Sequence, residues 1–192
     1  MQLYRVVPYL PNAKIGEPGH PTYLHHPQGA GRWDNPTLYD TWYLSTTPDG
    51  AIGEIFGDLP QWSEGMFEFP PLPGARRALA TFSLPDATRI LDLDDASQLA
   101  KRNIRPSQLV ARNRGYTHGV AERIVAEREA DGTTAWTGVS WWSIQSPLWT
   151  NIAIFVPRSE RSPLSLSGVE PLDLATSAVR EAARTLVRPV RP

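Results

Sequence analysis

Prolines restrict the fold of this chain more than any other feature, because 19 of its 192 residues are proline. A proline fixes φ and removes a backbone N–H, so it interrupts the helix or strand in which it falls. Many short elements and long connections are therefore expected. Apolar and β-branched residues predict strands at 2–7, 41–45, 78–84, 89–93, 139–142 and 151–156. Pro8 and Pro11 are expected to end the first of these strands.

Helical spacing of apolar residues predicts a helix that starts at residues 46–48 and further helices at 94–103, 106–114, 117–130 and 173–187. The Pro-rich segment 60–77 and the Ser/Pro-rich segment 158–168 are predicted as connections. Strands and helices do not alternate strictly along the chain. The expected fold class is therefore α+β, with a modest mixed sheet and short flanking helices.

Composition excludes several functional classes. Hydrophobic residues make up 41% of the chain and charged residues 20%, which is typical of a globular domain. The net charge of −1 gives no bulk attraction to nucleic acid or to an anionic membrane, and no apolar run is long enough to span a bilayer. Without cysteine, disulfides, thiolate metal sites and cysteine nucleophiles are excluded. The N-terminus lacks the features of a signal peptide, so a cytoplasmic protein is expected.

The helix after residue 47 carries a carboxylate that needs an explanation. Its predicted buried stripe is Ile52, Ile55, Phe56 and Leu59, at i, i+3, i+4 and i+7. At about 100° per residue, Glu54 lies nearly opposite that stripe. Glu54 therefore faces either solvent or a cleft, and the periodicity does not decide between them.

Several familiar catalytic motifs are missing from the sequence. There is no phosphate-cradling P-loop, no Gly-rich dinucleotide fingerprint after a strand, and no serine in a nucleophile elbow. His25 and His26 are adjacent in a Pro-rich loop and lack metal-ligand spacing, so no metal is expected.

Two stretches, 31–54 and 138–146, hold the remaining candidates. Arg32 offers a planar fork for phosphate or carboxylate oxygens, or it simply tethers the surface or core. Alternation places Tyr43 on the strand face opposite Trp42 and Leu44. Five of the seven tryptophans lie in or beside these stretches, where they either pack the core or line a ligand pocket.

The order of these motifs resembles the RES domain family, which is named for its Arg, Glu and Ser. A Gly-Arg-aromatic turn, an aromatic-x-Ser strand, a helix with Glu and a distal Gly-Val-x-aromatic-x-Ser stretch precede an apolar strand. Here they are 31–33, 43–45, 51–54, 138–143 and 151–155. The resemblance spans roughly residues 2 to 187, nearly the whole chain.

The resemblance implies an ADP-ribosyltransferase-like fold and an enzyme that consumes NAD⁺. It also implies a toxin that is paired with a helix-turn-helix (Xre-type) antitoxin. The activities it implies are NAD⁺ phosphorolysis with inorganic phosphate as co-substrate, NAD⁺ hydrolysis, or ADP-ribosylation of a protein. Residues 1–157 would form the catalytic core, and residues 158–192 a loop and a helix that packs on the same domain.

The same resemblance implies roles for individual residues. Glu54 would stabilise the cationic ribose, Arg32 would bind the pyrophosphate or incoming phosphate, and Tyr43 would contact the nicotinamide. Ser143 would hydrogen-bond the ribose or the amide, although Ser140 and Ser146 compete for this role. Further substrate contacts are expected from Trp33, Ser45 and Trp142.

One consequence of these roles can be checked in a structure. Arg32, Tyr43, Glu54 and Ser143 should converge on one cavity. A different class of function also stays open, in which the Trp- and Pro-rich loops bind a peptide, a sugar or a partner protein without turnover. The sequence permits a homodimer or a hetero-oligomer and selects neither.

Overall fold

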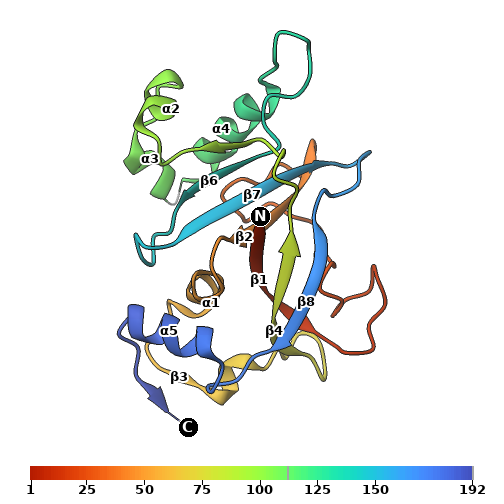
Figure 1. Cartoon of the computed structure of the whole chain (residues 1–192), viewed down its shortest axis with the longest axis vertical. Coiled ribbons are helices and arrows are strands. Elements are labelled where there is room, and N and C mark those ends of the chain that lie inside the picture. Colours follow the sequence, from red (N-terminus) through yellow and green to blue (C-terminus); the bar gives the residue numbers. More distant parts are fainter. Residues whose placement is uncertain (112, 192) are drawn as a thin grey trace.

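Seven strands form one mixed sheet in the computed structural model, which describes residues 1–111 and 113–191 (Figure 1). Their order is β5-β6-β7-β2-β1-β4-β8; β5 and β6 are parallel and the other neighbours antiparallel. The strands are β1 Gln2–Tyr9, β2 Tyr39–Ser45, β4 Arg76–Ser83, β5 Ile90–Asp92, β6 Gly138–Trp142, β7 Thr150–Pro157 and β8 Ser165–Pro171. A small second sheet pairs β3 (Trp62–Ser63) with β9 (Val190–Arg191).

Short helices gather in two groups, one in the upper half and one in the lower half of the view in Figure 1. One group holds α2 (Ala96–Lys101), α3 (Pro106–Val110) and α4 (Arg114–Ala126). The other packs α1 (Pro48–Phe56) against α5 (Ser177–Thr185), with the 3₁₀ turn η1 (Glu64–Phe67) nearby. The predicted α+β class, with a mixed sheet and short flanking helices, is confirmed. No helix in the described part of the chain is long and apolar enough to cross a membrane.

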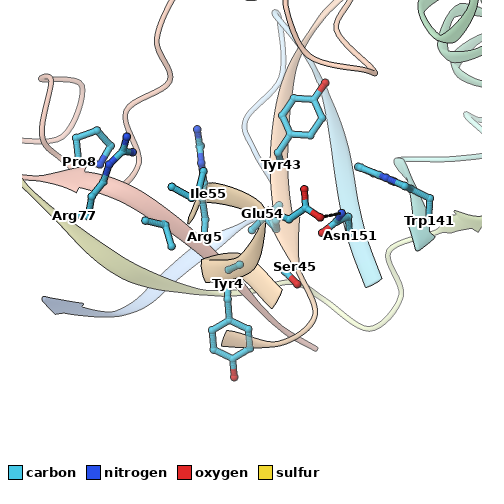
Figure 2. Close-up of a pocket in the computed structure, with 13 residues that line it drawn as sticks. Tyr4, Arg5, Pro8, Tyr43, Ser45, Glu54, Ile55, Arg77, Trp141 and Asn151 are labelled. Atoms are coloured by element: carbon cyan, nitrogen blue, oxygen red, sulfur yellow. Dashed lines mark hydrogen bonds between the residues drawn. The ribbon is translucent and has the colours of Figure 1, made fainter. Parts of the chain in front are cut away.

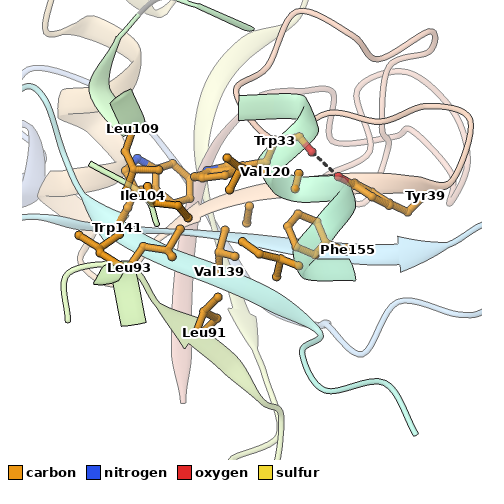
Figure 3. Packing of buried hydrophobic residues seen from close by; sticks show 14 residues of the cluster. Trp33, Tyr39, Leu91, Leu93, Ile104, Leu109, Val120, Val139, Trp141 and Phe155 are labelled. Carbon is orange, nitrogen blue, oxygen red and sulfur yellow. Dashed lines mark hydrogen bonds between the residues drawn. The ribbon is translucent and has the colours of Figure 1, made fainter. Parts of the chain in front are cut away.

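The two helix groups cover one face of the sheet with two separate apolar clusters. Directly opposed residues of neighbouring strands share a face, so the registers place Val6, Tyr43 and Ala153 on this face. The cluster under α2–α4 includes Trp33, Leu109, Val120, Val139 and Phe155 (Figure 3). The cluster under α1 and α5 includes Val6, Ile52, Leu79, Trp149 and Val179. A third cluster, with Leu3, Trp42, Phe82 and Ile154, lies on the opposite face.

The first strand continues through Pro8, which corrects the expectation that this proline ends it. β1 pairs with β4 from Gln2 to Tyr9, and Pro8 lies opposite Arg77. On its other side β1 pairs with β2 through Tyr4 and Ser45, near its beginning. The missing N–H of Pro8 is tolerated because β2 has diverged from β1 at that point.

The buried side of α1 also differs from the predicted stripe. Ile52 and Phe56 are buried as expected, but Ile55 is 45% exposed and Leu59 is 37% exposed. The helix buries its small residues instead, because Trp149 packs so closely on Gly53 that a Cβ there would collide with the indole. Glu54 stays on the open side of the helix.

The predicted connections are partly structured. β8 begins at Ser165, inside the segment 158–168, and β3 and η1 lie inside 60–77. β8 is an edge strand whose side chains are mostly exposed, so its sequence has no apolar alternation. Val179 and Ala182 of α5 share one cluster with Ile52 and Phe56 of α1.

Candidate active site

A cavity of about 400 Å³ opens between the two helix-covered clusters (Figure 2). Its walls come from β1, β2, α1, β4, β6 and β7. It exists because β1 and β2 separate beyond Tyr4 and Ser45, so that the next residues, Arg5 and Leu44, border the opening. The polar and aromatic groups that matter below are Arg5, Tyr43, Glu54, Arg77, Trp141 and Asn151.

Glu54 is anchored in this cavity by one of its two oxygens. Ser143 Oγ donates a hydrogen bond to Glu54 Oε1. Asn151 Nδ2 donates to the same oxygen at 2.8 Å (Figure 2). The backbone N–H of Gln145 donates to Ser143 Oγ at 3.0 Å, which orients the hydroxyl. Within the described residues, Oε2 accepts no hydrogen bond. One oxygen is therefore fixed by the protein, and the other is available to a ligand.

The three candidate serines have different neighbours. Ser143 is 2% exposed and lies behind Glu54 rather than in the cavity wall. Ser140 Oγ donates to Asp92 Oδ1 at 3.2 Å, and Ser146 Oγ accepts from the backbone of Leu148 at 3.3 Å. Ser143 is thus the serine of this stretch that contacts Glu54.

The ring of Tyr43 lines the cavity, while its hydroxyl forms hydrogen bonds with the protein. The hydroxyl donates to Asp34 Oδ1 at 2.7 Å and accepts from the backbone N–H of Trp33 at 2.8 Å. Burial, with the adjacent Asp34 charge, raises the pKa of Tyr43 far above its usual value, so the phenol stays protonated. A Cβ on Gly31 would collide with this hydroxyl, which explains the glycine of the Gly-Arg-Trp turn.

Arg32 lies outside the cavity wall, although it is electrostatically close to it. Its Nη1 donates to the carbonyl of Ala111 at 3.1 Å. Burial and the like charge of Arg114 lower the pKa of Arg32, while Tyr43 and Glu54 raise it. Of the four residues expected to converge on one cavity, Tyr43 and Glu54 line it, Ser143 contacts Glu54 without lining it, and Arg32 is not part of its lining.

The aromatic contacts differ from those expected. Trp33 is completely buried and packs edge to face on Trp141, with ring centroids 5.5 Å apart (Figure 3). It therefore belongs to the core and not to the cavity wall. Trp142 packs against the same cluster and does not line the cavity either. Trp141, which lies opposite Asn151 on the neighbouring strand, lines it instead.

Ser45 lines the cavity as a buried residue at the point where β1 meets β2. Its Oγ donates to the carbonyl oxygen of Thr150 at 3.3 Å. This bond connects β2 to the neighbouring β7, so the donor of the Ser45 hydroxyl is already used within the protein.

Sequence reasoning missed Asn151, Arg5 and Arg77. The Arg5 guanidinium stacks on Trp42 at 5.4 Å, and its buried Nη1 has no hydrogen-bond partner in the described part of the chain. Burial lowers the pKa of Arg5 to about 10, so the group is still a cation at neutral pH. Each of these residues lies in a strand, and no local pattern distinguishes it from a structural residue.

Among residues 1–111 and 113–191, no group of three or more His, Asp or Glu side chains is placed to hold a metal ion.

The sequence matches the RES domain over residues 2–176, and the chain therefore belongs to the RES domain family. No curated protein matches it. Its structure is similar to a chain in the crystal structure of the M. tuberculosis MbcT–MbcA toxin–antitoxin complex, with a TM-score of 0.55 and 14% identity. That alignment covers 97% of this chain and 88% of the other, so the fold is shared over nearly the full length.

Proposed function

We propose that this protein cleaves the nicotinamide–ribose bond of NAD⁺, as an NAD⁺ phosphorylase or glycohydrolase. The observation that carries the proposal is Glu54, held in a cavity by one oxygen with its other oxygen free. Membership of the RES family, with the substrate that the resemblance implies, supports the same reaction.

The chemistry needs a carboxylate in this position. When the bond between ribose C1 and the nicotinamide nitrogen breaks, its electron pair goes to nicotinamide, which leaves as a neutral molecule. Positive charge develops on the ribose, as in glycoside hydrolysis. The free oxygen of Glu54 stabilises this charge and accepts hydrogen bonds from the ribose hydroxyls. Ser143 and Asn151 act through Glu54 by fixing its orientation.

The rest of the cavity suits the other parts of a dinucleotide. The rings of Tyr43 and Trp141, whose centroids are 6.5 Å apart and whose planes are perpendicular, offer an apolar corner for the nicotinamide. Arg5 lies between Glu54 and Arg77 in Figure 2. Its guanidinium, whose Nη1 has no hydrogen-bond partner among the described residues, would bind the diphosphate. Arg32 lies outside the wall, but its charge interacts with Tyr43 and Glu54, so it would attract an incoming phosphate toward the ribose.

The biological role follows from the family resemblance. A RES protein with this activity would be the toxin of a type II toxin–antitoxin pair and would act on cytoplasmic NAD⁺. The similarity in fold to a chain of a toxin–antitoxin complex supports this role. The antitoxin partner is expected to be a helix-turn-helix (Xre-type) protein.

Nicotinamide release is the direct test. Protein stripped of any bound partner is incubated with NAD⁺, with and without inorganic phosphate, and the products are separated by chromatography. Nicotinamide with ADP-ribose 1″-phosphate identifies phosphorolysis, and nicotinamide with ADP-ribose identifies hydrolysis. Label transferred from NAD⁺ to a lysate protein would identify ADP-ribosylation instead. The absence of nicotinamide under both conditions would contradict the proposal and favour a binding domain.

A further inference from the structure

Arg77 lines the end of the cavity far from Glu54 (Figure 2), and the proposed function gives it no role. It lies on β4 opposite Pro8 of β1, and it lines the same cavity as Glu54. Figure 2 shows Arg77 beside Pro8 at one end, Glu54 and Asn151 toward the other, and Arg5 between them. The cavity therefore has a second cationic position beyond Arg5.

The register of the sheet places Arg77 on the ligand side. Asn151, Ser45 and Tyr4 form one row across three strands and share a face with Pro8, which is four residues further along β1. Arg77 lies directly opposite Pro8. Its Cα is therefore roughly 13 Å along the strands from the row that contains Asn151, the residue that hydrogen-bonds to Glu54. This separation suits the adenosine half of a dinucleotide whose nicotinamide ribose lies at Glu54.

The local contacts of Arg77 hold it ready for an anion. Its guanidinium carbon lies over the Phe69 ring, 4.4 Å from the ring centroid, and this cation–π contact uses none of the N–H donors. Its buried Nε has no hydrogen-bond partner, and no carboxylate pairs with it, within residues 1–111 and 113–191. Burial alone lowers its pKa.

Neighbouring Arg76 shows what a structural arginine looks like on this strand. Its Nη2 lies 3.3 Å from Glu64 Oε2, both side chains are half exposed, and Arg76 does not line the cavity. Arg77 has none of this charge compensation. A cation that is partly desolvated and unpaired inside a cavity is stabilised when an anion enters.

We infer that Arg77, stacked on Phe69, is a phosphate ligand for the adenosine half of the bound dinucleotide. This inference rests on the proposed function for the orientation of the ligand. The phosphate is either the adenosine 5′-phosphate of the diphosphate or a 2′-phosphate, as in NADP⁺. Both are phosphate esters on the same ribose, and the planar fork of Arg77 can bind either one with two parallel hydrogen bonds.

Binding measurements without turnover test this assignment. Calorimetry with AMP and with adenosine 2′,5′-bisphosphate is carried out on wild-type protein and on Arg77→Met, Arg77→Lys and the matched control Arg76→Met. Arg77→Met is expected to weaken binding at least about tenfold, and Arg77→Lys less. Loss with both nucleotides assigns the 5′-phosphate, and loss confined to the bisphosphate assigns the 2′-phosphate. Arg76→Met is expected to bind as wild type does.

Two results would overturn the assignment: wild-type affinity of Arg77→Met for both nucleotides, or no binding of either by the wild type. Circular dichroism confirms that each variant is folded. Because no step depends on catalysis, a protein that binds these nucleotides through Arg77 and releases no nicotinamide would refute the proposed function alone.

Discussion

Two regions of the molecule each contain an arginine and a glutamate, and they use them in opposite ways. Between α2 and the end of α4, the Arg102 side chain is 9% exposed and donates to both Glu127 oxygens, at 2.8 and 2.6 Å. In the cavity, Glu54 is held by the neutral side chains of Ser143 and Asn151. Arg5 has no acidic partner within the described residues.

The difference separates a structural charge pair from a ligand site. Arg102 and Glu127 neutralise each other, so they stabilise the fold and have little left to offer a ligand. Glu54 and Arg5 line one cavity without neutralising each other, which is costly in the free protein because a desolvated charge is unpaired. NAD⁺ would satisfy both, with a ribose that becomes cationic and a diphosphate that is anionic.

The largest expected effect is on the rate of nicotinamide release, when the carboxylate of the cavity is neutralised. Glu54→Gln keeps the shape and the hydrogen-bond reach of the side chain but removes its charge. Nicotinamide release should fall at least about 100-fold, because charge stabilisation of the transition state is lost. Glu127→Gln is the matched control and should retain wild-type turnover per folded molecule. A Glu54→Gln enzyme with the wild-type rate would remove the basis of the proposed mechanism.

Replacement of Arg5 should weaken substrate binding without lowering the stability of the protein. Arg5→Met should raise KM for NAD⁺ by about 10- to 100-fold, because a charge-assisted hydrogen bond to the diphosphate is lost. The free protein should become more stable by about 1 kcal/mol, since a buried unpaired charge is removed. Arg102→Met should do the reverse, with lower stability and an unchanged KM. Steady-state kinetics and thermal unfolding measure both quantities, and a destabilised Arg5→Met protein would argue that Arg5 is structural.

The serine behind Glu54 should affect the rate more than the binding of substrate. Ser143→Ala leaves Asn151 as the remaining donor to Glu54 Oε1, so the carboxylate is less well oriented but still charged. We expect kcat to fall about tenfold, the equivalent of one hydrogen bond, with KM nearly unchanged. Ser140→Ala, which removes the bond to Asp92, is the control. A rise in KM at constant kcat would instead indicate that Ser143 contacts the substrate directly.

Sequence reasoning succeeded where the signal is local. The cap and proline of α1 predicted its start, and side-chain alternation placed Tyr43 opposite Trp42 and Leu44. It failed for Arg5 and Arg77, because their shared cavity depends on β1 leaving β2 after Tyr4 and pairing with β4 from a distant part of the chain. Long-range strand pairing leaves no trace in the residues next to either arginine.

Trp33 and Ile55 show a related limit. The family resemblance implied a substrate contact for Trp33, which is instead buried in the core, and periodicity predicted a buried Ile55, which is 45% exposed. In both cases a partner far away in sequence determines which side chain is buried. Trp141 packs on Trp33, and Trp149 packs closely on Gly53, so that the Gly53 side of α1 is buried. Which side of a short helix is buried therefore depends on the shape of its neighbours as well as on apolar periodicity.

The smallest expected effect is on the pH dependence of stability, and it comes from the Arg102–Glu127 pair. Burial tends to raise the pKa of Glu127, but hydrogen bonds from Arg102 and Trp136 and the Arg102 charge outweigh it and lower the pKa below 4.5. A carboxyl whose folded pKa is depressed contributes stability above its unfolded value, and this contribution disappears as the pH falls through the folded value. Glu127→Gln should therefore unfold a few degrees below wild type at pH 7, and the difference should shrink toward pH 3. A constant difference across this range would mean that the charge of Glu127 does not contribute to stability.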